Sequence, residues 1–205
     1  MFRPTKLTAL CAAFTVAISY ATTVKAQETA PSRVRGTLTE VSPSQVKMRT
    51  RDGKELEVAI NNDTKVVAVA LTDISAIKPD SYIGTAAAPQ PDGSLKALEV
   101  HVFPSSMRGV GEGSTPWDLT PGSTMTNGAV GSIVGTDGRV LTVKYGDAER
   151  KVSVPADVPV VSMEPADQTA LSVGSKALLL AVKETDGSSS ARFVIVGKDG
   201  LAPPM

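Results

Sequence analysis

Short runs of alternating apolar and polar residues fill most of the chain after its first 30 positions. A period of two is typical of β-strands, because successive side chains point to opposite faces of a sheet. Asp-Gly pairs, which favour tight hairpin turns, separate several of these runs. The pattern predicts strands at residues 34–41, 46–48, 56–60, 82–88 and 95–103, and again at residues 132–134, 140–145, 151–154, 176–182 and 190–196.

A short helical turn is expected between the third and fourth strands of each series. In the first series it covers residues 72–77, where Thr72 or Asp73 can cap the first turn and Pro79 stops it. In the second series it covers residues 166–171. Asp73 and its counterpart Asp167 are therefore interpreted as helix caps.

The two series are related by a constant spacing of 94 residues. Asp92-Gly93 recurs as Asp186-Gly187, and the same offset relates Val100 to Val194. A fixed offset without gaps indicates an internal duplication. It divides the chain into one repeat at 34–103, a connector at 104–128, a second repeat at 129–197 and a C-terminal tail at 198–205.

Three strands, a short helix and two strands is the element order of the oligonucleotide- or oligosaccharide-binding (OB) barrel. We therefore predict an all-β fold of two tandem small OB-like β-barrels, one in each repeat, each with its helical turn between strands three and four. A unit of roughly 70 residues buries only about 60% of its unfolded surface. The two units are thus expected to pack against each other or against the connector.

Residues 1–26 have the features of an export signal. Arg3 and Lys6 precede an apolar run at 7–18, and Val24-Lys25-Ala26 offers small residues for cleavage before Gln27. This run is shorter than the roughly 20 residues that a membrane-spanning helix needs. Its removal leaves 18 basic and 21 acidic residues, a net charge of −3, and also removes the only cysteine, Cys11. We expect a periplasmic protein without disulfides or a membrane span, and not a lipoprotein.

Two short motifs carry a resemblance to a known family. They are Gly36-Thr37-Leu38 and Lys96-Ala97-Leu98-Glu99-Val100, whereas the second repeat departs from them with Gly131-Ser132-Ile133 and Ser190-Ala191-Arg192-Phe193-Val194. In these motifs the chain resembles an uncharacterised family of exported bacterial proteins with tandem OB-like domains, a domain of unknown function. The resemblance covers nearly the whole mature chain. It implies an exported two-unit protein and brings no activity with it.

The connector is the main candidate for a recognition surface. Its Gly, Pro, Ser and Thr content argues against regular structure, yet it holds the only tryptophan, Trp117, between Pro116 and Asp118. One interpretation is structural: Trp117 fills a gap between the barrels, and Arg108 pairs with Glu112 or Asp118. The other is a binding loop in which Trp117 is the anchor and Arg108, Glu112 and Asp118 select the ligand. The family resemblance favours the second, because its members carry a similar Arg-Gly-x-Gly-Glu-Gly and Pro-Trp-Asp pattern.

A copper site is the alternative hypothesis. His101, the only histidine, precedes Met107 and Met125, and thioethers with imidazole suit Cu(I). The three residues lack a compact spacing, however. On an alternating strand His101 also lies on the face opposite Val100 and Val102, which predicts a position toward solvent.

Other chemistries have weaker support. The acidic residues fall largely in turns, and the sequence has no Gly-x-Ser-x-Gly motif, calcium loop or phosphate loop. Few aromatic residues and a negative charge argue against nucleic acid as a partner. We therefore predict a periplasmic, non-enzymatic binding or interaction module without a cofactor, whose partner is an unknown periplasmic ligand or protein. Copper handling through His101, Met107 and Met125 remains the alternative.

Overall fold

A computed structural model describes residues 32–135 and 139–205 of the chain. Within these residues the fold is all-β, and the longest helical segments are single turns of three residues. None of the helices in this part of the chain is long and apolar enough to cross a membrane. The predicted export signal, residues 1–26, lies outside the described residues.

Two halves of the chain contain the same order of elements. The first half comprises β1 (Ser32–Ser42), β2 (Gln45–Thr50), β3 (Glu55–Ala59), β4 (Lys65–Leu71), the 3-10 turn η1 (Ile74–Ala76), β5 (Tyr82–Pro89) and β6 (Leu95–Val102). The second comprises β8 (Thr124–Val134), β9 (Val140–Tyr145), β10 (Ala148–Ser153), β11 (Val160–Ala166), η3 (Gln168–Ala170), β12 (Lys176–Lys183) and β13 (Ser189–Gly197). Between them lie η2 (Ser105–Met107) and β7 (Gly113–Pro116), and η4 (Lys198–Gly200) follows β13.

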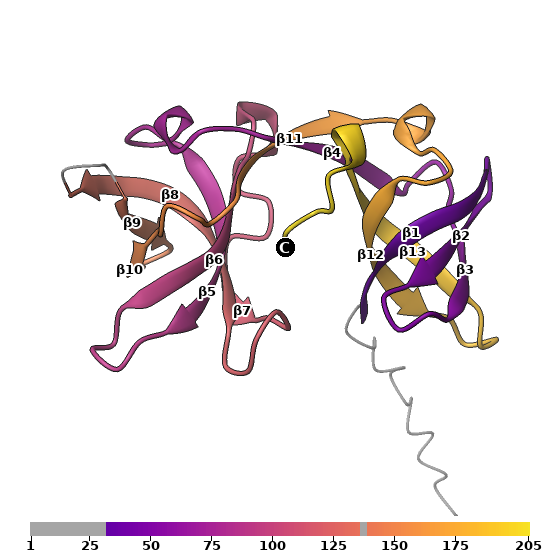
Figure 1. Cartoon of the computed structure of the whole chain (residues 1–205), viewed down its shortest axis with the longest axis horizontal. Coiled ribbons are helices and arrows are strands. Elements are labelled where there is room, and N and C mark those ends of the chain that lie inside the picture. Colours follow the sequence, from indigo (N-terminus) through magenta and orange to yellow (C-terminus); the bar gives the residue numbers. More distant parts are fainter. Residues whose placement is uncertain (1–31, 136–138) are drawn as a thin grey trace, which may run out of the picture.

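The strands pair across the two halves rather than within each half. β5 and β6 form a closed five-stranded barrel with β8, β9 and β10, and a parallel contact between β6 and β10 completes it. On the other side of the molecule, β1, β2 and β3 form a second strand ring with β12 and β13 (Figure 1). This second strand ring returns to its start through one residue pair, Ala59 with Ser190. The prediction of one barrel in each repeat is therefore wrong, because each half contributes three strands to one ring and two to the other.

β4 and β11 connect the two rings. They pair antiparallel with each other, while β4 runs parallel to β13 and β11 runs parallel to β6. Val69 lies opposite Met163, and these positions are 94 residues apart, which is the spacing between the two series in the sequence. The halves are thus related by an approximate twofold arrangement around this pair.

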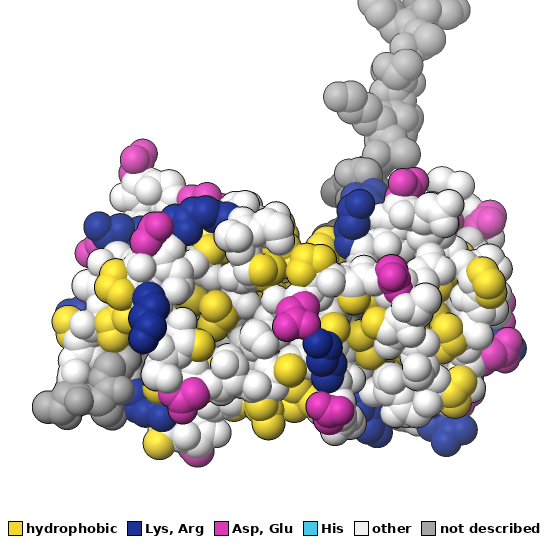
Figure 2. Space-filling view, turned by 90° about the horizontal axis from the view of Figure 1, so that it is seen from above, with side chains coloured by type: hydrophobic (Ala, Val, Ile, Leu, Met, Phe, Trp, Pro, Cys, Tyr) yellow, Lys and Arg dark blue, Asp and Glu magenta, His cyan; other side chains and the backbone are white. Residues whose placement is uncertain are grey.

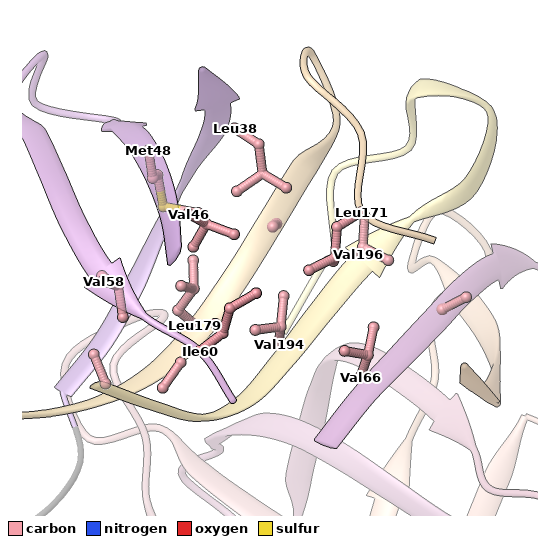
Figure 3. Packing of buried hydrophobic residues seen from close by; sticks show 14 residues of the cluster. Leu38, Val46, Met48, Val58, Ile60, Val66, Leu171, Leu179, Val194 and Val196 are labelled. Carbon is pink, nitrogen blue, oxygen red and sulfur yellow. The ribbon is translucent and has the colours of Figure 1, made fainter. Parts of the chain in front are cut away.

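Three apolar clusters fill the molecule. Alternate residues of β1, β2, β3, β12 and β13 fill the second strand ring, with Leu38, Met48 and Leu179 fully buried (Figure 3). Ile83, Leu141 and Val152 belong to the corresponding cluster of the barrel. The third, called here the central cluster, lies outside the interiors of the two rings. It contains residues of β4, β5, β11, β12 and β13, together with Phe103 and the C-terminal Met205. Its members include Val69, Tyr82, Met107, Met125, Met163 and Ile195. Both rings therefore bury part of their outer surface in the middle of the molecule.

Local signals in the sequence fix the turns and caps. The carboxylate of Asp73 accepts a hydrogen bond from the Ser75 amide, and that of Asp167 accepts one from the Thr169 amide. Both aspartates are thus helix caps, as predicted. Gly93 and Gly187, the glycines of the two predicted Asp-Gly turns, have φ angles of 80° and 88°. Only residues that tolerate a left-handed backbone suit these positions, and glycine does so without strain.

The exchange of strands predicts that neither half folds alone. A fragment of residues 32–103 supplies three strands to one ring and two to the other, so it should be an unfolded or self-associated chain. Mixed with a fragment of residues 104–205, it should form a one-to-one complex with the far-UV circular dichroism of the intact protein. Size-exclusion chromatography of each fragment and of the mixture measures this. A cooperatively folded monomer of residues 32–103 would contradict the observed pairing.

Candidate functional site

The connector is ordered and contains regular structure. η2 follows β6 after Phe103 and Pro104, and β7 pairs antiparallel with the first residues of β8. The composition-based prediction of an irregular segment is therefore wrong for 113–116 and for 124–128. The prediction failed because backbone hydrogen bonds to β8 stabilise β7, although the residues of β7 have little β-propensity of their own.

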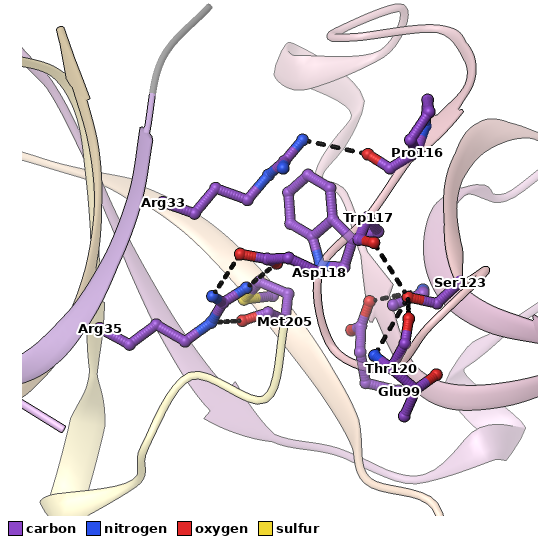
Figure 4. Close-up of polar contacts among 10 residues, drawn as sticks. Arg33, Arg35, Glu99, Pro116, Trp117, Asp118, Thr120, Ser123 and Met205 are labelled. Carbon is purple, nitrogen blue, oxygen red and sulfur yellow. Dashed lines mark hydrogen bonds and ion pairs between the residues drawn. The ribbon is translucent and has the colours of Figure 1, made fainter. Parts of the chain in front are cut away.

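Trp117 follows β7 and is half-buried. Its amide donates to the carbonyl of Ser123 at 2.8 Å, which closes the loop after β7. The guanidinium of Arg33, from β1, lies 3.8 Å from the centre of the indole ring (Figure 4). The ring also packs against the central cluster. Trp117 therefore connects the connector to the second strand ring through cation–π and apolar contacts.

Asp118 is held by Arg35 of β1. Two guanidinium nitrogens of Arg35 donate to the carboxylate at 2.9 and 2.7 Å, and a third donates to the carbonyl of Met205 at 2.9 Å (Figure 4). These hydrogen bonds and the positive charges of Arg35 and Arg33 lower the pKa of Asp118 from its ordinary value of 3.8. Arg35 thus ties the connector and the C-terminus to the same strand.

Arg108 and Glu112 make other contacts than those predicted. Arg108 donates to the carboxylate of Asp80 at 2.6 Å and to the carbonyl of Asp80 at 2.8 Å. It therefore pairs with neither Glu112 nor Asp118. Glu112 accepts a hydrogen bond from the amide of Gly146 at 2.9 Å. Of the four tentative binding residues, Arg108, Glu112 and Asp118 are engaged in internal contacts, and Trp117 alone borders the pocket described below.

His101 is buried, with 4% of its surface exposed. The prediction of a position toward solvent is wrong, although its side chain does lie on the face opposite Val100. That outer face of the barrel is covered by the central cluster instead of water. Nδ1 of His101 lies 3.1 and 3.2 Å from the two carboxylate oxygens of Glu99, which is itself fully buried. The Ala86 amide donates to the same carboxylate at 2.8 Å.

Two rows of residues surround this histidine on the outer face of β6, β5 and β8. His101, Gly84 and Asn127 are register partners in one row, and Glu99, Ala86 and Met125 are partners in the next. A Cβ atom at Gly84 would lie 2.0 Å from Nε2 of His101 and 2.3 Å from Oδ1 of Asn127. The imidazole therefore extends over Gly84 toward Asn127, and the glycine makes the space for it.

A cavity of about 270 Å³ lies against these rows and is called here the central pocket. His101, Trp117 and Asn127 contribute polar or aromatic groups to its wall. Residues of the second strand ring, such as Leu180 and Ile195, form part of the opposite side. Four methionines also line it: Met107, Met125, Met163 and Met205. The structure thus brings together the three residues of the copper hypothesis, His101, Met107 and Met125.

Two residues that line the pocket, and the carboxyl partner of His101, escaped the sequence analysis. Met163 and Met205 belong to the other half of the chain, and only the exchange of strands places them near His101. Glu99 forms part of a recognised motif, but its burial depends on the central cluster. The i, i+2 spacing of Glu99 and His101 on one strand face was the one available signal for their contact.

Two polar atoms of the pocket residues are buried without a hydrogen-bond partner. They are Nε1 of Trp117, a donor, and Oδ1 of Asn127, an acceptor. Buried polar groups are rarely left unpaired, because each costs about 1–3 kcal/mol. Both atoms belong to residues that line the central pocket.

A wider groove of about 780 Å³ adjoins the pocket. The two hollows share Met107, Val110 and Phe193, and the groove continues along β4 and η3 through Lys65 and Gln168. The surface on the β4 and β11 side of the molecule carries acidic, basic and apolar side chains intermixed (Figure 2). The groove and the central pocket are therefore neighbours on the surface of the molecule.

Comparisons with known proteins give no relative from which a role could be transferred. No family model matches the chain, and neither a curated protein nor a solved structure matches it. The site must therefore be interpreted from its own chemistry.

Gly84→Ala should destabilise the protein, because the new methyl group would overlap His101 and Asn127. We expect a loss of about 1–3 kcal/mol, typical of overpacking in a close-packed interior. Chemical denaturation of the wild type and variant measures it. As a control, the same change in a His101→Ala background should cost clearly less, since the closest contact is gone. An equal cost in both backgrounds would contradict the described approach.

Asp118→Asn should reduce the dependence of stability on acid pH. The pKa of Asp118 is lower in the folded protein than its ordinary value of 3.8, so the ionised carboxylate stabilises the fold above that value. This contribution is lost as the pH falls through the lowered folded pKa. Melting temperatures between pH 7 and the acid limit of solubility should therefore fall less steeply in the variant. Asp63→Asn, at an exposed aspartate outside the connector, is the control; identical slopes for wild type and Asp118→Asn would argue against the interaction.

Proposed function

We propose that this chain is an exported, non-enzymatic binding protein whose recognition site is the central pocket beneath the connector. The connector contributes Trp117, while its charged residues hold the surrounding structure. The ligand-selecting part of the site is the pocket wall. This retains the predicted class of protein and moves the recognition surface from the exposed loop to the cavity below it.

The observation that carries the proposal is a largely apolar pocket in which two of the lining residues hold polar atoms without a hydrogen-bond partner. Nε1 of Trp117 can donate and Oδ1 of Asn127 can accept, and both residues line the central pocket. Ligand sites are typically apolar cavities with a few polar groups that fix the orientation of the ligand. The buried imidazole of His101, held by Glu99, adds a third such group. A merely structural interface would be expected to pair these groups internally.

The architecture is compatible with two OB-like units. We infer that the barrel and the second strand ring correspond to the two predicted OB-like barrels, built by exchange of strands between repeats. The recurrence of elements and the twofold arrangement around Val69 and Met163 support this assignment. Periplasmic location and membership in the exported family rest on residues 1–26 and on the quoted motifs.

A catalytic role is not part of the proposal. The Glu99–His101 pair resembles the orienting half of an acid–base dyad, but Nε2 approaches the amide of Asn127 and methionines share its cavity. Thioethers and a carboxamide neither attack a substrate nor transfer a proton readily. The neighbours of the histidine favour binding over catalysis.

Leu180→Phe should reduce occupancy of the pocket. Leu180 is a half-buried residue of the pocket wall, so a larger side chain there would fill space that the ligand needs. Native mass spectrometry of protein purified from the periplasm of a bacterial host should show a bound species in the wild type. We expect its affinity to fall at least about tenfold in the variant, equivalent to 1.4 kcal/mol.

Leu98→Phe is the matched control. Leu98 is also a half-buried leucine on a strand, but it does not line the pocket. The single tryptophan gives a second readout, since binding in the pocket should shift Trp117 emission in the wild type. Absence of any bound species and of any shift in emission with periplasmic extract would reject the proposed function.

A further inference from the structure

We infer that the central pocket is a site for a soft monovalent cation, Cu(I), with Nε2 of His101 and methionine thioethers as its ligands. The inference rests on the proposed function, because it names the class of ligand that the pocket takes. It also selects the copper hypothesis, which the sequence left open, because the fold brings His101, Met107 and Met125 to the same pocket.

Methionine sulfur is concentrated around one histidine. The described residues contain five methionines, and four of them line the central pocket with His101. They come from η2, β8, β11 and the C-terminus, so no local sequence motif accounts for their meeting. The fifth, Met48, lies inside the second strand ring. Thioethers and imidazole are donors that select Cu(I) over harder divalent cations.

The histidine is oriented as a metal ligand. Nδ1 of His101 contacts the carboxyl group of Glu99, which leaves Nε2 as the ring nitrogen that can bind a metal ion. Nε2 lies over Gly84, on the side where Asn127 and Met125 follow in the neighbouring strand. Metal-bound histidines commonly donate their second N–H to a carboxylate in this way.

Charge balance supports a cation rather than an anion. Glu99 is fully buried, and its polar contacts are the Ala86 amide and the imidazole. A buried carboxylate is costly unless a positive charge lies near it. A cation bound at Nε2 would lie across the imidazole ring from Glu99, a position that a negative charge on Glu99 favours for a cation and not for an anion.

The donor set also defines which metals fit. The part of the chain that the structure describes has no group of three or more His, Cys, Asp or Glu side chains that could hold a metal ion. The only cysteine is Cys11, within the predicted export signal. A site of one imidazole and several thioethers suits Cu(I) and its redox-inert analogue Ag(I), and offers little to Zn²⁺.

Methionines also fill irregular gaps in apolar cores without binding metal. Substitution by leucine separates the two roles, because it keeps the volume and apolar character and removes the sulfur. The experiment titrates the purified full chain with Cu(I) under anaerobic reducing conditions, against a chromophoric Cu(I) chelator. Ag(I) titration followed by native mass spectrometry gives the stoichiometry, and Trp117 emission reports whether the ion enters the central pocket.

We expect one equivalent of Cu(I) or Ag(I), with a change in Trp117 emission. His101→Ala and the double variant Met107→Leu/Met125→Leu should each weaken binding at least about tenfold, and so should the isosteric Glu99→Gln, as for other changes beside a metal ligand. Met48→Leu is the matched control and should bind as the wild type does. Circular dichroism verifies that each variant is folded, and the leucine variants keep the test valid if His101→Ala does not fold.

Two results would overturn the assignment. One is that neither ion binds at one equivalent; the other is that Met107→Leu/Met125→Leu binds as tightly as Met48→Leu. If a small organic molecule is retained and displaced by Leu180→Phe while both ions fail to bind, the cation assignment is wrong and the proposed binding function stands. If the pocket retains neither ion nor molecule, both proposals fail.

Discussion

The antiparallel pairing of β4 with β11 is the constraint on which the rest of the structure depends. Each of these strands carries the chain from one ring to the other, so that the strands before it and the strands after it belong to different rings. Neither ring is therefore closed by strands from one half alone. Non-local pairings of this kind require large loops to close before they stabilise anything. The two halves must therefore fold as one unit. The outer faces of the two rings meet near the Val69–Met163 pair, and the central cluster fills the space between the rings.

The connector illustrates how a segment with the composition of a recognition loop can be mainly structural. Its strand β7 extends the barrel, and Arg35 of the second strand ring holds Asp118 and the carbonyl of Met205. Ion pairs at a protein surface usually contribute little, but only 10% of the Arg35 side chain is exposed. An arginine that is mostly removed from water needs hydrogen-bond acceptors. Those of Arg35 come from the connector, at Asp118, and from the C-terminal residue, Met205. The connector consequently forms a fixed wall of the central pocket.

The Glu99–His101 pair is difficult to explain by stability alone. Removing a carboxyl group and an imidazole from water is expensive, and replacing buried polar pairs with apolar residues is often neutral or stabilising. The neighbouring positions of β5 are Gly84 and Ala86, and the missing side chain of Gly84 leaves the space that the imidazole occupies. The fold thus keeps a polar group, an opening and several thioethers in the same place. A ligand site gives this combination a physical reason, since it would use the charge, the space and the donors together.

The sequence alone determined the properties that depend on neighbours along the chain. Alternation of side chains placed most of the strands but missed β4, β7 and β11. The Asp-Gly pairs placed two hairpin turns, and Asp73 and Asp167 were identifiable as caps because each contacts an amide two residues away. It also put His101 on the correct face of its strand. It could not assign strands to rings, because two similar halves offer β6 two equivalent sets of partners, and the choice depends on packing around Val69 and Met163. The burial of His101 and the arrival of Met163 and Met205 beside it follow from that choice, since side chains distant in sequence meet only once the whole chain has paired.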